Sequence, residues 1–169
     1  MGLVSLKGGG YPGQDSSATD TAQNHPLGTL AVDSSGGEYI YARGCSTIPV
    51  MGSLMVMIPN STLSSAGAPQ AIVATQLSTA ATQGGPIGIV VSTAQSTSVF
   101  GWFQIYGPCT IAADSTQAAN TQMFASSLNT GQVAATTTGV RIYGLSITSS
   151  GGTASAQAAF AQYPHIQTA

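Results

Sequence analysis

Charged side chains are the scarcest feature of this sequence. Only 3 Lys or Arg and 5 Asp or Glu occur among 169 residues, a charged fraction of 5%, where a soluble globular domain carries about a quarter. Ala, Gly, Ser and Thr take their place and make up 86 residues. Little remains from which to build an ionisable active site. Because a weak net charge gives weak self-repulsion, the composition also favours a protein that associates.

Basic residues are too few and too scattered for nucleic-acid binding. The three are Lys7, Arg43 and Arg141. Affinity for DNA or RNA comes from a row of cations that neutralises successive phosphates. We therefore expect no nucleic-acid partner.

Long hydrophobic runs are also lacking. No apolar stretch approaches the roughly 20 residues that a membrane-spanning helix needs. Residues 1–6 are too short for the apolar core of a secretory signal, since Lys7 and three glycines follow at once. We expect a chain that neither enters a membrane nor is exported by the classical route.

The acidic residues show no arrangement typical of catalysis. General acid–base chemistry needs titratable groups that are brought together, and no two of these carboxylates suggest a working pair. Three of them fall in the first 26 residues or in a predicted turn. The five are Asp15, Asp20, Asp33, Glu38 and Asp114.

Histidine and cysteine are equally sparse. His25 and His165 lie at the two ends of the predicted globular part, and neither accompanies a G-x-S-x-G motif. Cys45 and Cys109 form no C-x-x-C pair and no cluster with histidine. The general burial of cysteine predicts two buried free thiols, with a disulfide between them left open. We expect no catalytic residue, no metal site and no cofactor, and hence a protein that is not an enzyme.

The amino-acid composition of the chain changes after residue 26. Residues 1–26 hold a triple glycine, two prolines near glycine or histidine, and a polar stretch with almost nothing apolar after Leu6. Such a segment is either a disordered terminus or an extended arm that lies across a neighbouring subunit. The prediction is a flexible N-terminal arm over 1–26 and one domain over 27–169.

Short β-strands dominate the predicted domain. Residues 27–32 and 38–42 are rich in β formers and flank a five-residue turn that ends in two glycines, which predicts a β-hairpin. Further candidates end at Gly, Pro, Asn or Ser. Their spacing predicts an all-β fold, a β-sandwich or β-barrel of short antiparallel strands. The further strands are expected at 50–58, 87–91, 99–106, 140–148 and 153–163.

For two segments the sequence does not decide between helix and another structure. Residues 69–80 fit either a short helix that begins at Pro69 or a strand over 72–75. Residues 114–123 fit a polar loop or a single helical turn capped by Asp114. Neither alternative changes the fold class.

Several strands are apolar on both alternations, and the clearest is 100–106, with Trp102 among its aromatic residues. A strand of this kind is covered on both faces. We expect Trp102 in the core, with an intersubunit contact or a sugar-binding platform as alternatives. The second apolar face together with the low charge favours a homo-oligomer.

Segments 27–41, 99–107 and 139–145, with a closing strand before Pro164, resemble the head decoration, or cement, proteins of tailed bacteriophages. The resemblance rests on pattern and composition, and it places no functional residue. It implies a β-rich subunit, most simply a homotrimer, on the outer surface of the virion. Its partner would be the major capsid protein, whose lattice it would stabilise by binding the assembled form.

Two other functions remain open. The Ser, Thr and Gly texture with exposed aromatics also fits a phage tail or fibre component with a receptor- or carbohydrate-binding surface. A secreted hydrolase or lectin-like β-sandwich enzyme is the other alternative, and the shortage of acids and histidines argues against it.

Overall fold

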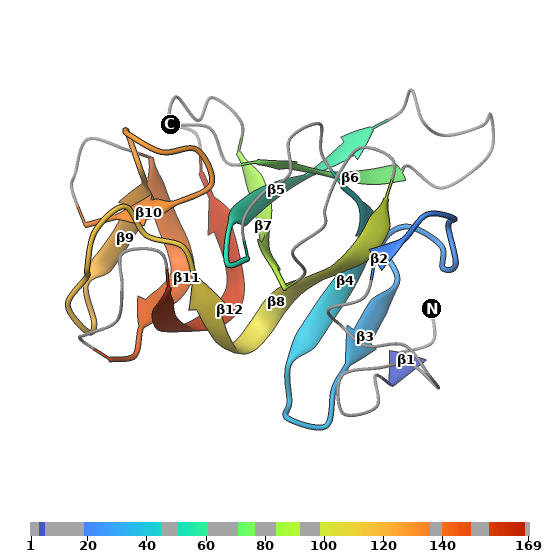
Figure 1. Ribbon diagram of the computed structural model, residues 1–169, viewed down its shortest axis with the longest axis horizontal. Coiled ribbons are helices and arrows are strands. Elements are labelled where there is room, and N and C mark those ends of the chain that lie inside the picture. Colours follow the sequence, from blue (N-terminus) through green and yellow to red (C-terminus); the bar gives the residue numbers. More distant parts are fainter. Residues whose placement is uncertain are drawn as a thin grey trace.

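The computed structural model describes residues 19–44, 51–57, 84–91, 99–135, 140–149 and 156–167, together with the strand backbone at 4–5, 58–60 and 71–76. Within these ranges the chain forms twelve strands and no helix, so the predicted all-β class is confirmed. The strands join in one sheet that does not close into a barrel (Figure 1), in the order β1-β3-β4-β6-β5-β7-β8-β12-β11-β9-β10, with β2 beside β8. The strands are β1 Val4–Ser5, β2 Thr19–Asp20, β3 Leu30–Val32, β4 Glu38–Arg43, β5 Leu54–Asn60, β6 Ala71–Gln76, β7 Gly85–Val90, β8 Phe100–Ile111, β9 Gln122–Ala125, β10 Val133–Ala134, β11 Arg141–Ile147 and β12 Gln157–Ile166.

The predicted hairpin is confirmed as β3 and β4, which pair antiparallel. Its turn is organised by Asp33, whose Oδ1 accepts hydrogen bonds from the backbone N–H groups of Ser35 (2.9 Å) and Gly37 (2.8 Å). Gly36 adopts φ 83°, a left-handed conformation that glycine enters without steric cost.

Strand β8 is the longest element and links the two halves of the molecule (Figure 1). Its first half pairs with β4 and its second half with β12. The sequence predicted a strand that stops at Tyr106, before Gly107 and Pro108, but β8 continues to Ile111. Gly107 takes φ 100°, so it bends the strand instead of ending it.

Strand β12 also passes the proline that was expected to close it. The prediction was 153–163, whereas β12 covers Gln157–Ile166 and includes Pro164. Proline is tolerated in sheets at irregular positions such as bulges, and here Pro164 lies within the change of register between β11 and β12.

The two segments for which the sequence allowed a helix, 69–80 and 114–123, are non-helical where they are described. Residues 71–76 form β6, antiparallel to β5, so the helical alternative for 69–80 is wrong over this stretch. Residues 114–121 form bends and turns that lead into β9. Asp114 caps no helix, and instead its carboxylate accepts hydrogen bonds from the hydroxyls of Ser115 (3.1 Å) and Ser126 (2.9 Å).

Three apolar clusters make up the described core. Trp102 is fully buried, as its place in an alternating strand predicts, and it packs with Tyr41 and Ala31. The largest cluster fills the space between β5, β7 and the β9–β12 half. Its bulky members are Leu54, Ile87, Ile89, Ile111, Met123, Ile142 and Ile147.

Parts of residues 1–26 pair with this domain. Strand β1 runs parallel to β3, and β2 pairs with β8 at Phe100 and Gly101. The Tyr41 hydroxyl donates a hydrogen bond of 2.8 Å to Asp20. The boundary at residue 26 and the expected mobility of the arm stay predictions.

Candidate functional site

Every carboxylate within the described ranges accepts a hydrogen bond from a hydroxyl group. Tyrosines donate to Asp20 and Glu38, serines donate to Asp114, and Asp33 accepts from both Tyr39 and Ser35. Each acid therefore supports a turn or a contact between strands, while Asp15 lies outside the described residues. The bonds are Tyr41 to Asp20 (2.8 Å), Tyr39 to Asp33 (2.8 Å), Tyr163 to Glu38 (2.7 Å) and Ser126 to Asp114 (2.9 Å).

The two histidines occupy different aromatic contacts. The His25 ring lies 5.1 Å from Tyr41 and 5.3 Å from Trp102, centroid to centroid. His165 stacks on Tyr143 at 5.4 Å and 16° between the planes. The described residues nowhere bring together three His, Cys, Asp or Glu side chains that could hold a metal ion. Nor does any helix in these ranges have the length and hydropathy needed to cross a membrane.

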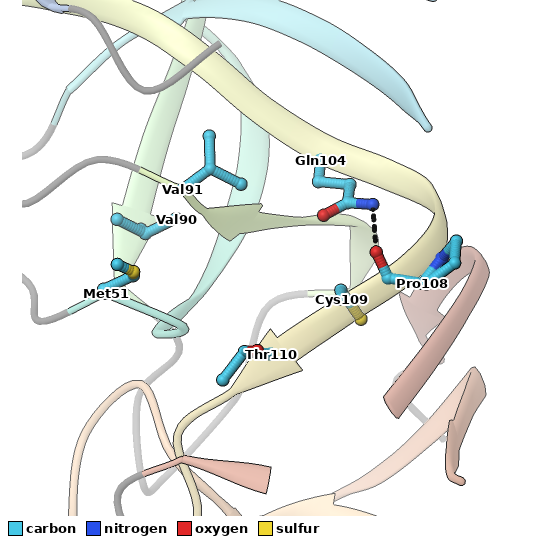
Figure 2. A pocket seen from close by; sticks show the side chains of 7 residues that line it. All are labelled: Met51, Val90, Val91, Gln104, Pro108, Cys109 and Thr110. Atoms are coloured by element: carbon cyan, nitrogen blue, oxygen red, sulfur yellow. Dashed lines mark hydrogen bonds between the residues drawn. The ribbon is translucent and has the colours of Figure 1, made fainter. Parts of the chain in front are cut away.

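A hollow of about 360 Å³ opens between β7 and the second half of β8 (Figure 2). In its lining, the Gln104 amide donates hydrogen bonds to the carbonyls of Tyr106 (3.1 Å) and Pro108 (2.8 Å). Burial raises the pKa of the Cys109 thiol to about 12, so this free thiol stays protonated at neutral pH. Cys45 lies outside the described residues. The lining residues are Met51, Val90, Val91, Gln104, Pro108, Cys109 and Thr110.

Aromatic side chains gather on the outward face of three neighbouring strands, β8, β12 and β11. On β12 the alternate residues Ala159 and Ala161 are buried, while the residues between them face outward. The outward rings form what we call the aromatic strip: Tyr106, Tyr143, Phe160, Tyr163 and His165. Tyr163 is exposed and the other four are half-buried.

Strand pairing places the strip residues next to one another. Tyr106 lies opposite Gln162 on β12 and opposite Glu38 on β4, and Tyr143 lies opposite His165. Directly opposed residues in an antiparallel pair share a face. Glu38 therefore stands at the β4 end of the aromatic strip.

A bulge between β11 and β12 turns Tyr163 outward. The partner on β12 changes from His165 to Ala161 between Tyr143 and Leu145, so β12 has two extra residues there. Tyr163 adopts φ 49°, a left-handed conformation that is uncommon for a bulky side chain. Its ring ends 54% exposed.

The Tyr163 ring is held in place at both its edge and its face. Its hydroxyl donates a hydrogen bond of 2.7 Å to Glu38 Oε2, and its ring lies 5.3 Å from that of Tyr106. Tyr106 in turn meets Phe160 edge to face at 5.5 Å. The hydrogen bond to Glu38 raises the pKa of Tyr163 above its ordinary value of 10. The proton therefore stays on the phenol at neutral pH.

At the β11 end of the aromatic strip a cation covers a ring. The Arg141 guanidinium carbon lies 4.7 Å from the centre of the Tyr143 ring, within cation–π range. The same guanidinium donates a hydrogen bond to Gln122 Oε1. Tyr143 thus contacts both the Arg141 guanidinium and the His165 ring.

A second exposed feature is the tip between β9 and β10, residues 126–131. Ser126 Oγ accepts hydrogen bonds from the backbone N–H groups of Leu128 (3.1 Å) and Asn129 (3.0 Å). The Ser126 backbone N–H bonds the Gln132 carbonyl at 2.9 Å. Leu128 projects from this braced turn and is 78% exposed, more than any other large apolar side chain described.

Comparisons with known proteins found no matching family model, no matching curated protein and no matching solved structure. Fold and surface therefore carry the functional argument. Sequence patterns located the aromatic segment 100–106 but did not connect Tyr106 with Tyr143 and Tyr163. The available signal was an aromatic residue beside Gly144 and another beside Pro164, where strands are irregular.

Proposed function

We propose that this chain is a structural virion protein that binds the outside of an assembled phage capsid and stabilises it, as decoration or cement proteins do. The supporting observation is Leu128, a large apolar side chain 78% exposed on a turn that is braced by its own hydrogen bonds. An anchor that is already ordered loses little conformational entropy when it docks. Apolar anchors that enter a partner's pocket supply most of the energy of many interfaces.

The distribution of charge supports the same function. The described carboxylates accept hydrogen bonds from hydroxyl groups within the fold, as at Glu38 and Asp114. Few charges remain for attraction to a partner, so attachment relies on apolar burial and backbone hydrogen bonds. The affinity of such a contact hardly changes with ionic strength.

The partners in this proposal are the major capsid protein and further copies of the chain, arranged as a homotrimer. Met51, 51% exposed, lies close in sequence to Leu54, whose backbone N–H bonds the Gly131 carbonyl at the tip (2.8 Å). The start of β5 and the tip thus form adjoining surfaces with exposed apolar groups. Exposed apolar groups that adjoin are typical of interaction surfaces.

A tail or fibre component with a receptor-binding surface is the second candidate. The aromatic strip favours it, because exposed tyrosines with polar neighbours suit recognition of a polar ligand. The two candidates differ in location on the particle.

The test is thermal release of genome from particles with and without this protein, at low and high salt. Particles that lack it should assemble but release their genome at lower temperature, and high salt should leave the difference in place. Particles that carry Leu128→Ser should resemble those without the protein. The matched control is Leu30→Ser, since Leu30 is also exposed (40%) but lies on β3. Equal release temperatures with and without the protein would contradict the proposal and favour the tail or fibre candidate.

A further inference from the structure

The aromatic strip is a partly exposed surface whose residues differ from those of the tip at Leu128. We propose that it binds a neutral oligosaccharide along the outward face of β8, β12 and β11, with Glu38 and Arg141 at its two ends.

The strip is extended and crosses neighbouring strands. Glu38 lies on β4, Tyr106 on β8, Tyr163 and His165 on β12, and Tyr143 on β11. These four strands are neighbours in pairs, and a spacing of about 4.8 Å between strands gives a length of about 14 Å. A surface of this length suits several sugar units in a row better than a single one.

The rings match the two kinds of surface that a sugar unit presents. A pyranose has a face of C–H groups, which packs against an aromatic ring, and an edge of hydroxyl groups, which needs hydrogen-bonding partners. Tyr163 offers an exposed ring, and its hydroxyl remains in a polar contact with Glu38. Amphipathic rings of this kind occur where one side of a ligand is apolar and the other is wet.

Polar groups of both types border the rings. At the β4 end the Glu38 carboxylate accepts the bond from Tyr163 through Oε2, and an ionised carboxylate has capacity for further donors. Gln162, exposed and opposite Tyr106, adds an amide with both donor and acceptor atoms. At the β11 end, Arg141 supplies donors beyond the one that it gives to Gln122. Neighbouring sugar hydroxyls donate and accept at once, which fits this mixture.

The rings are ordered before any ligand arrives. Tyr163 is fixed by the bulge, by Glu38 and by Tyr106, and Tyr143 is held by contacts with Arg141 and His165. The φ of 49° at Tyr163 is unfavourable for a bulky residue, and strain of this kind concentrates at binding sites. Ordered rings bind with less entropy loss than mobile ones.

The charge and composition of the strip favour a neutral sugar over other ligands. Arg141 is its one cation, too few for a phosphate backbone. The exposed aliphatic side chains that an apolar protein or lipid partner would require lie elsewhere, at Leu30, Met51 and Leu128. The strip instead presents rings, amides and one charge of each sign.

The experiment uses the purified full-length chain. Short neutral oligosaccharides of glucose, galactose, mannose and N-acetylglucosamine are titrated by calorimetry, and ligand contacts are mapped by saturation-transfer NMR. Tyr163→Ala and Tyr143→Ala should each raise the Kd at least about tenfold, since each removes an aromatic ring from the proposed interface. Tyr163→Phe keeps the ring and should retain most of the affinity.

Leu128→Ala is the matched control, an exposed apolar side chain outside the strip, and it should leave the Kd within about twofold. Near-UV circular dichroism from buried Trp102 shows whether each variant is folded; if one is not, the other ring variant still decides the outcome. The proposal is overturned if no member of the panel binds with a Kd below about 10 mM. It is also overturned if ring removal leaves the Kd unchanged.

Discussion

The Tyr163 hydroxyl donates a hydrogen bond of 2.7 Å to the Glu38 carboxylate, which joins residues 125 positions apart in the chain. Glu38 begins β4 in the first hairpin, and Tyr163 lies in β12 near the end of the sequence. Both strands pair with β8. One end of the aromatic strip is therefore assembled from the first hairpin and the last strand.

Removing only the hydroxyl tests what this contact contributes. Tyr163→Phe keeps the ring and leaves Glu38 accessible to water, so the free energy of unfolding should fall by only about 0.5–1 kcal/mol. Urea denaturation of the two proteins measures the difference. Glu38→Gln retains an acceptor for the Tyr163 hydroxyl. Its free energy of unfolding should therefore lie between that of the unaltered protein and that of Tyr163→Phe. If Tyr163→Phe lost more stability than Tyr163→Ala, the hydrogen bond would do more than fix the ring.

A pair of glycine substitutions tests the bulge that displays Tyr163. At Gly144 (φ 69°) an added Cβ would collide with the Gln162 backbone oxygen, whereas at Gly36 (φ 83°) it would meet nothing within 4 Å. Gly36→Ala should cost only the backbone strain, about 1–2 kcal/mol. Gly144→Ala should cost more, because the backbone of β12 must move as well. Thermal denaturation gives both values, and equal losses would contradict this account of the bulge.

The difference between local and long-range information explains what the sequence predicted. The hairpin at β3 and β4 and the burial of Trp102 follow from alternation and turn residues within a few positions, and both were predicted. The continuation of β8 past Pro108 depends on pairing with β12, and that of β12 past Pro164 depends on pairing with β11 and β7. Local patterns do not contain this information. The strip was missed for the same reason, because only sheet pairing and a two-residue bulge bring Tyr106, Tyr143 and Tyr163 to one face of the sheet.

The Asp33 turn should make the hairpin sensitive to acid. Burial of the carboxylate opposes its ionisation, but hydrogen bonds from the Ser35 and Tyr39 hydroxyls and from backbone N–H groups outweigh it, and the pKa of Asp33 lies below its ordinary 3.8. A lowered pKa contributes stability above pH 3.8, and that contribution is lost as the pH falls through the folded-state value. Asp33→Ala should therefore destabilise by about 1–2 kcal/mol at neutral pH and by less in acid. Urea denaturation midpoints at neutral and at acidic pH measure the stability that Asp33→Ala loses. A loss that is the same at both pH values would contradict the lowered pKa of Asp33.

Tyr41 should give the opposite dependence, in alkali. Burial, together with the hydrogen bond that it donates to Asp20, raises the pKa of Tyr41 above its ordinary value of 10. A raised pKa contributes stability that is fully present below pH 10 and is lost as the pH rises above it. Tyr41→Phe should therefore unfold with a weaker dependence on pH above 10. Tyrosinate absorbance followed during alkaline titration provides the measurement, and titration of all tyrosines near pH 10 in the folded protein would refute the shift.

Two N-terminal deletions separate the part of residues 1–26 that belongs to the domain from the part that does not. Residues 19–26 include β2, which pairs with β8, as well as Asp20, bonded to Tyr41, and His25, packed on Trp102. Deleting residues 1–18 removes β1, a two-residue strand beside β3, and should lower the free energy of unfolding only slightly. Deleting 1–26 also uncovers Trp102 and Tyr41 and leaves Tyr41 without its acceptor, so the further loss should be about 2–4 kcal/mol.

Denaturant unfolding of both truncated chains, followed by near-UV circular dichroism, measures these losses. If the two deletions cost the same, residues 19–26 contribute nothing to the fold, and the arm ends at residue 26 as the sequence predicts. If only the longer deletion is costly, the domain begins near Thr19, because β2 and His25 close the aromatic end of the core. The structure favours the second result, since a core that contains Tyr41 and Trp102 needs cover where β8 begins.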